Sequence, residues 1–142
     1  MPVRELPARP NLAQYKKQAK ELVVAFLLGR GVDVAAKLPP NRQTGLHWAA
    51  HGGYPDIVRL LLRHGARVEP RDGTFQGTAL DWALHGWVGR EKKAAADRYH
   101  AVVKLLVAAG ATFFKEGLDE PASAIAKKIR SDASMRAALG RD

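Results

Sequence analysis

Two pairs of residues contain the side-chain types from which this chain could build a catalytic or metal site. His47 and His51 are four residues apart, a spacing that can direct two imidazoles on one helix at a single metal ion. The zinc-protease form of this motif needs a glutamate directly after the first histidine, where this chain has Trp48. Asp81 and His85 repeat the spacing and could act as an acid and a base.

A nucleophile beside these pairs is not evident in the sequence. The chain's three serines all stand near its end, outside any Gly-x-Ser-x-Gly elbow: Ser123, Ser131 and Ser134. We therefore expect no enzyme activity, no metal and no cofactor. An enzyme with a metal or ligand at His47 and His51, or at Asp81 and His85, ranks third among the possible functions.

The two pairs occupy equivalent places in two copies of one longer pattern. Residues 44–52 (TGLHWAAHG) recur as residues 78–86 (TALDWALHG), an offset of 34. Each copy is followed by an apolar run that closes on Gly-Ala, at Gly65 and at Gly110. A fixed period of this length is typical of stacked supersecondary units, because each unit buries its apolar face only against a neighbour.

Helical spacing of apolar residues indicates the elements of this stack. We expect an amphipathic helix over residues 11–29 and short inner helices over 44–50 and 78–84. We also expect an outer helix over 56–63, turn segments at 37–43 and 71–77, and terminal helices over 121–130 and 132–139. Gly65 and Gly110 are 45 residues apart, 11 more than the period, so the second repeat carries an insertion at about 87–98. Its alanine-rich centre favours helix, and we expect it to extend a neighbouring helix or to form a protruding helical turn.

The repeated pattern resembles ankyrin repeats. The residues that match are Thr44, Leu46, His47, Ala49, Ala50, Gly53, Ile57, Val58, Leu60, Leu61, Leu62, Gly65 and Ala66. The chain departs from the family pattern in the proline position, filled by Gly45 and Ala79, and in Asp81, which replaces the second histidine. The sequences of residues 6–12, 15–20 and 71–86 resemble those of small bacterial members of the family.

This resemblance implies an all-α fold, an ankyrin-repeat α-solenoid of helix-turn-helix pairs with degenerate terminal caps. The single domain 1–142 would comprise an N-terminal cap or half repeat (11–37), a repeat (38–71), a repeat with the insertion (72–111) and a C-terminal cap (112–142). In such stacks the partner commonly binds the concave face, which is formed by the turn tips and the inner helices. Mapped residue by residue, the concave face here contains Pro40, Asn41, Arg42, Gln43, Trp48, His51, Gly52, Thr74, Phe75, Gln76, Trp82 and His85.

The resemblance thus predicts a non-enzymatic module that binds a protein partner. We expect the partner to contact Arg42, Gln43, His51, Phe75, Gln76, His85 and Trp87. Trp48 and Trp82 hold equivalent positions, so we expect them to pack in the core or between repeats, whereas Trp87 starts the insertion and is expected to be partly exposed.

The net charge of +9 supports an alternative function, electrostatic binding of nucleic acid or another polyanion. Its basic residues would be Lys16, Lys17, Lys20, Arg90, Lys92 and Lys93. The chain has no cysteine, its first residues show no secretory signal, and no apolar run is long enough to span a membrane. We therefore expect a monomeric cytoplasmic protein without a membrane contact.

Overall fold

The computed structural model describes residues 20, 24–25, 27–90, 92–113 and 123–141. These residues fall into two compact units, residues 1–32 and residues 33–142. In the first unit the described residues from 24 to 29 are helical, and the helix ends in a turn at Gly31, whose φ is +83°. Most of the helix expected over 11–29 lies outside the described residues.

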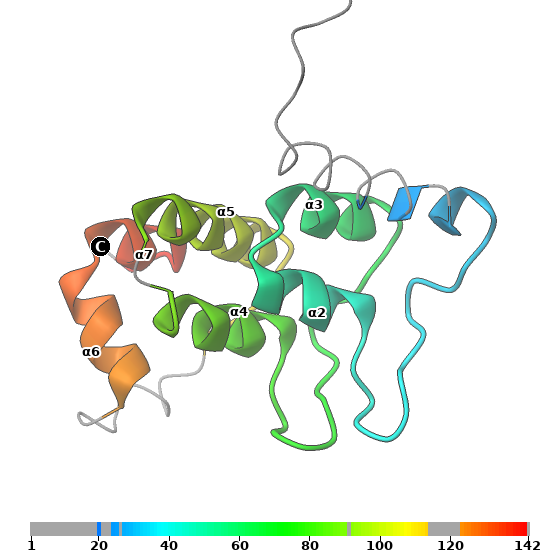
Figure 1. The fold of residues 1–142 in the computed structure, drawn as a ribbon, viewed down its shortest axis with the longest axis horizontal. Coiled ribbons are helices and arrows are strands. Elements are labelled where there is room, and N and C mark those ends of the chain that lie inside the picture. The colour runs from blue at the N-terminus through cyan, green and yellow to red at the C-terminus, as the bar shows by residue number, and fades with distance from the viewer. Residues whose placement is uncertain (1–19, 21–23, 26, 91, 114–122, 142) are drawn as a thin grey trace, which may run out of the picture. The chain divides into compact units, whose positions relative to one another are not determined.

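The second unit is built from helices, as Figure 1 shows. Helix α2 (Gly45–Gly52) pairs with α3 (Pro55–Arg63), and α4 (Ala79–Val88) pairs with α5 (Lys93–Ala108). Helices α6 (Ala124–Ser131) and α7 (Ala133–Ala138) continue the two rows, α6 beside α4 and α7 beside α5. The expected inner, outer and terminal helices are confirmed, and α2 and α4 run two and four residues past their expected ends.

A threonine begins each inner helix. The Thr44 side chain accepts a hydrogen bond from the His47 backbone N–H, and the His47 side chain accepts one from the Thr44 N–H. Thr78 and Asp81 make the same reciprocal arrangement at the start of α4. Such a capping box satisfies backbone donors that have no partner inside a helix. The repeated threonine therefore fixes where each inner helix starts.

The insertion lengthens the second helix pair. Helix α4 has 10 residues against 8 in α2, and α5 has 16 residues against 9 in α3. The expected helix extension is therefore confirmed, and both helices share it.

The expected exposure of Trp87 is wrong, because its side chain is 0% exposed. The Lys128 ammonium of α6 lies 4.5 Å from the Trp87 ring centroid, and the His100 ring of α5 packs against the indole at 6.3 Å. The terminal helices thus cover a residue that the sequence places at an insertion.

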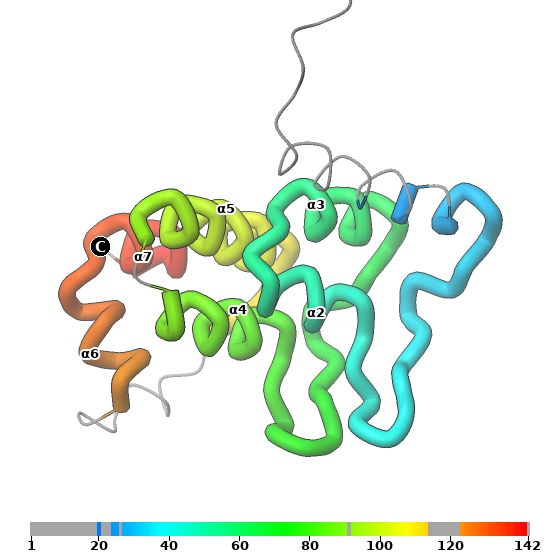
Figure 2. The backbone as a smooth tube through the Cα atoms, viewed as in Figure 1, coloured from blue at the N-terminus to red at the C-terminus, as the bar shows by residue number. Residues whose placement is uncertain are grey.

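Two loops, residues 37–43 and 71–77, extend side by side from the inner helices, and we call them the finger loops (Figure 2). The Leu38 N–H donates to the Gln43 carbonyl at 2.8 Å, and the Asp72 N–H donates to the Gly77 carbonyl at 3.0 Å, an equivalent bond 34 residues later. The Gly73 N–H donates to the Asn41 carbonyl at 2.6 Å and joins the two loops. The finger loops are therefore ordered by hydrogen bonds within each loop and between them.

The core of the second unit lies between the inner and outer helices. Small residues such as Ala50 and Ala83 are fully buried where the helices approach each other. Larger side chains fill the space between successive pairs: Leu46, Val58, Leu80, Leu84, Tyr99, Val102, Val103 and Leu106. Burying one such side chain stabilises the fold by about 1.5–3 kcal/mol. This packing holds the inner helices and the finger loops in a fixed relation.

Candidate functional site

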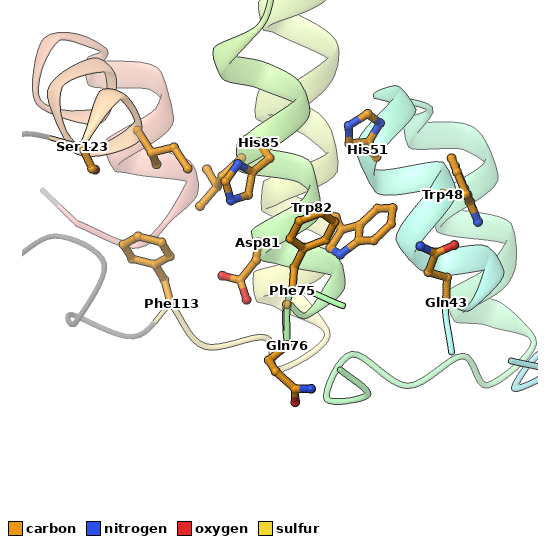
Figure 3. A pocket seen from close by; sticks show the side chains of 13 residues that line it. Gln43, Trp48, His51, Phe75, Gln76, Asp81, Trp82, His85, Phe113 and Ser123 are labelled. Atoms are coloured by element: carbon orange, nitrogen blue, oxygen red, sulfur yellow. The ribbon is translucent and has the colours of Figure 1, made fainter. Parts of the chain in front are cut away.

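An open hollow of about 830 Å³ lies among the finger loops, the inner helices and the start of α6 (Figure 3). Its polar lining comes mainly from loop ends and exposed helix positions, and its apolar lining is largely aromatic. The lining residues are Gln43, Trp48, His51, Phe75, Gln76, Gly77, Asp81, Trp82, Leu84, His85, Phe113, Ser123 and Ile125. Such a hollow with a few polar groups is typical of binding sites.

Trp82 is the centre of an aromatic cluster in this hollow. The rings of His47, Trp48, His51 and Phe75 meet it edge to face, with centroid distances of 5.4 to 6.5 Å. Trp82 is only 9% exposed, whereas Trp48 is 50% and Phe75 is 75% exposed. Trp82 thus packs between the repeats as expected. Trp48 contacts it there, but half of the Trp48 side chain is exposed. Two large aromatic surfaces face solvent around a buried indole.

Asp72 holds Trp82 and the second finger loop together. Its side chain is 0% exposed and accepts hydrogen bonds from the N–H groups of Thr74, Phe75 and Gly77 at 2.7 to 3.0 Å. It also accepts one from the Trp82 Nε1–H at 3.1 Å. Burial of the carboxylate raises its pKa, but these hydrogen bonds outweigh that cost and lower the pKa from 3.8 to about 2. Asp72 is therefore an ionised anchor, a role that was not predicted although an Asp-Gly pair in a turn segment is a usable signal.

His47 bridges the two repeats. Its Nε2 lies 3.0 Å from the Gly77 carbonyl oxygen, which only accepts, so Nε2 carries the proton. Its Nδ1 then accepts from the Thr44 N–H at 3.1 Å. Both ring nitrogens are thus engaged inside the protein, which gives His47 a structural role rather than that of a metal ligand beside His51. Among the described residues, no group of three or more His, Cys, Asp or Glu side chains could hold a metal ion.

Asp81 and His85 both line the hollow on its α4 side, where Figure 3 places them. The Asp81 carboxylate accepts hydrogen bonds from the Thr78 N–H at 2.9 Å and from the Thr78 hydroxyl at 3.1 Å. Ser123 also reaches the lining, but its hydroxyl accepts the Ala126 N–H and caps α6. These contacts give the aspartate and the serine capping roles.

The structure brings together most of the predicted partner-binding residues. Gln43, His51, Phe75, Gln76 and His85 all line the hollow. Arg42 is exposed on the first finger loop beside Gln43 and outside the lining, and the buried Trp87 lies elsewhere. That these residues contact a partner stays a prediction.

Eight lining residues were not predicted as partner contacts: Trp48, Gly77, Asp81, Trp82, Leu84, Phe113, Ser123 and Ile125. Three of them follow the second repeat, where the repeated pattern is absent, so only the docking of α6 beside α4 could reveal them. The sequence signal there is limited to an expected terminal cap.

The residues of the nucleic-acid alternative divide between the two units. Arg90, Lys92 and Lys93 are exposed around the turn from α4 to α5, and Lys20 is exposed in the first unit. Lys16 and Lys17 lie outside the described residues. None of the helices that the structure describes is long and apolar enough to cross a membrane.

Comparisons with known proteins identify the repeat. A family profile described as "Ankyrin repeats (3 copies)" matches residues 12–116. The chain is 39% identical over 59 residues to mouse "Ankyrin repeat and SOCS box protein 6" and 39% identical over 57 residues to its human counterpart. These matches cover 42% and 40% of this chain but only 14% of each relative.

A third relative is "E3 ubiquitin-protein ligase hecd-1" of Caenorhabditis elegans, 41% identical over 61 residues, which are 43% of this chain and 2% of that protein. The chain therefore spans a small part of the length of the curated relatives that it matches. These relatives are animal proteins, and a bacterial source for this chain stays a prediction.

Proposed function

The chain belongs to the ankyrin-repeat family, and from this premise we propose that it is a non-enzymatic module that binds a protein partner through its concave face. The observation that carries the proposal is the pair of exposed rings, Trp48 and Phe75, beside the buried Trp82. Large aromatic side chains that are held in place are the residues that most often dominate the binding energy of protein interfaces.

The hydrogen bonds of Asp72 and His47 support this proposal, because they fix the second finger loop before any partner arrives. Asp72 holds the backbone on both sides of Phe75, and His47 holds the Gly77 carbonyl. A surface that is already ordered loses less conformational freedom when it binds. The finger loops therefore suit a binding surface.

The composition of the hollow also favours a protein partner. Two glutamines, two histidines and four aromatic side chains line it, together with a single carboxylate from Asp81. Aromatic residues with a few adaptable polar groups are typical of protein interfaces. His47, Asp81 and Ser123, which could otherwise suggest chemistry, have bridging and capping roles.

Affinity capture with variants tests the proposal. The chain would be immobilised and its partner identified in an extract of the source cells, with captured proteins quantified by mass. We expect Arg42→Ala, Phe75→Ala and Gln76→Ala each to reduce capture without a change in melting temperature, since all three side chains are exposed. Arg63→Ala, on the outer helix α3, is the control. A partner whose affinity is indifferent to all three finger-loop variants would show that the concave face is not the binding surface.

A further inference from the structure

We infer that the partner segment is acidic, with an apolar side chain that enters the hollow between Trp48 and Phe75 and a neighbouring carboxylate that meets Arg42. This inference rests on the proposed function and names the chemistry of the partner. It depends on three observations: the backbone of the finger loops, their surface charge and the apolar lining beside them.

The first observation is a repeated backbone strain. Arg42 has a φ of +54° and Gln76, 34 residues later, has a φ of +53°. This left-handed conformation suits glycine, because a Cβ crowds the backbone there. Both repeats nevertheless place a long polar side chain at the strained position, where it is exposed. Strained residues that persist on a surface are commonly kept for what their side chains contact.

No residue in the described part of the chain engages the Arg42 side chain. Its guanidinium makes no hydrogen bond, ion pair or ring contact there, and Arg42 is exposed on the first finger loop directly before Gln43, which lines the hollow. Gln76 also lines the hollow, and its amide makes only a 3.3 Å bond to the Gly73 carbonyl. An exposed guanidinium on a residue adjacent in sequence to the lining of an aromatic hollow is well suited to a partner's carboxylate, which it can bind through two parallel hydrogen bonds.

The second observation is the sign of the charge on the finger loops. Lys37, Arg42 and Arg71 are exposed cations on these loops. The loops contain a single acidic residue, Asp72, which is fully buried and accepts four hydrogen bonds. The exposed charge of the loops is therefore positive. A positive rim steers and orients an acidic partner and repels a basic one.

The third observation is the position of the apolar surface. Trp48 and Phe75 flank Trp82 on the side of the hollow that adjoins the finger loops, as Figure 3 shows. Asp81, the one carboxylate of the lining, lies on the opposite side of Phe75 from Trp48, and one of its oxygens caps α4. An apolar anchor thus fits between the exposed rings, and its acidic neighbour belongs next to Arg42 rather than next to Asp81.

Selection from a library of random peptides displayed on phage, with the full chain as bait, tests the inference. We expect the selected peptides to combine an apolar or aromatic residue with adjacent aspartate or glutamate. A synthetic copy of the strongest binder would then be titrated against variants. Arg42→Glu should weaken the affinity for this peptide by about tenfold or more. Arg63→Glu on the outer helix changes the net charge by the same amount and should weaken the affinity by less than about twofold. Binding should also weaken as salt is raised.

Arg42→Gly separates binding from folding. Glycine adopts the positive φ without a Cβ clash. The melting temperature of the Arg42→Gly variant should therefore equal or exceed that of the wild type, while its affinity for the peptide falls. A purely structural role for Arg42 would not produce opposite changes in stability and binding.

The outcomes distinguish this inference from the proposed function. The acidic partner would be overturned if the selected peptides were basic or uncharged, or if Arg42→Glu and Arg63→Glu had equal effects. If Phe75→Ala still weakened the binding of those peptides, the proposal that the concave face binds the partner would stand. Selected peptides that are indifferent to Trp48→Ala and Phe75→Ala would overturn the concave face as well. A selection that enriches no sequence would count against both.

Discussion

The Trp82 indole N–H donates a hydrogen bond of 3.1 Å to the Asp72 carboxylate, which stands ten residues earlier at the base of the second finger loop. One oxygen of Asp72 accepts this bond together with the Gly77 N–H, and the other accepts the N–H groups of Thr74 and Phe75. A single buried charge thus ties the loop that carries the exposed Phe75 to the helix that carries the buried Trp82. The conformation of the loop and the packing of the aromatic cluster therefore depend on the same carboxylate.

Replacing this charge should destabilise the fold in a way that depends on pH. Asp72→Asn removes an ionised acceptor of four hydrogen bonds and places an amide group where only acceptors fit, so we expect a loss of about 1–3 kcal/mol at neutral pH. The pKa of Asp72 falls from 3.8 to about 2 on folding. Its stabilisation is therefore fully present above pH 3.8 and is lost as the pH falls through about 2.

Urea unfolding between neutral pH and about pH 2 measures both effects. The difference in stability between the wild type and Asp72→Asn should shrink over the acid range. Asp56→Asn, at an exposed pair with Arg59 on α3, is the control and should change stability little. A difference that stays constant down to the lowest pH would contradict an ionised anchor.

His47 and Asp81 hold equivalent positions in the two repeats but should differ in their contribution to stability. His47→Ala leaves the buried Gly77 carbonyl without its donor and removes half of the α2 capping box, so we expect a loss of about 2–3 kcal/mol. Asp81→Ala removes a part-buried cap only, and we expect about 1 kcal/mol. Urea midpoints of the two variants make the comparison, and losses of equal size would argue against the bridge between repeats.

Gly86 should tolerate no larger residue. A Cβ there would overlap the His51 backbone carbonyl and lie 2.9 Å from the Tyr99 hydroxyl, which itself donates to that carbonyl. Relief requires a backbone shift between α2 and α4, so Gly86→Ala should cost about 1–3 kcal/mol or more. Gly89→Ala is the matched control, since its Cβ would make only an ordinary 3.8 Å contact with the Gly86 carbonyl. Melting temperatures of the two variants test this, and equal values would show that the helices can separate without cost.

Lys128 should hold the terminal helices to the second repeat. Its ammonium donates to the carbonyls of Trp87 at 2.7 Å and Arg90 at 3.0 Å, at the end of α4, and lies over the Trp87 ring. Lys128→Ala should cost about 1–2 kcal/mol, because charged donors make the stronger hydrogen bonds.

Hydrogen exchange gives a local measure of this contact. In the Lys128→Ala variant the amides of α6 and α7 should exchange faster, whereas those of α2 and α3 should change little. Lys127→Ala, at the exposed neighbouring position, should leave the exchange of α6 unaltered. Equal protection of α6 in both variants would show that the cation is dispensable for docking.

The sequence alone determined the repeated part of this protein. The offset of 34 aligned Thr44 with Thr78 and Trp48 with Trp82, and the two turn segments expected at 37–43 and 71–77 are the finger loops. Local signals suffice for these features, because capping threonines, turn residues and helical spacing act within a few residues of each other.

The burial of each aromatic side chain, and the residues that line the hollow on its α6 side, follow only from the tertiary structure. Trp48 and Trp82 share one repeat position, yet Trp48 is half exposed and Trp82 is buried, because rings of the preceding repeat and Phe75 of its own finger loop pack around Trp82. Trp87 is buried because α6 docks over the insertion, and the same docking adds Ser123 and Ile125 to the hollow. Burial depends on which neighbour covers a position, and in a stack that neighbour comes from a distant part of the chain that local periodicity does not describe.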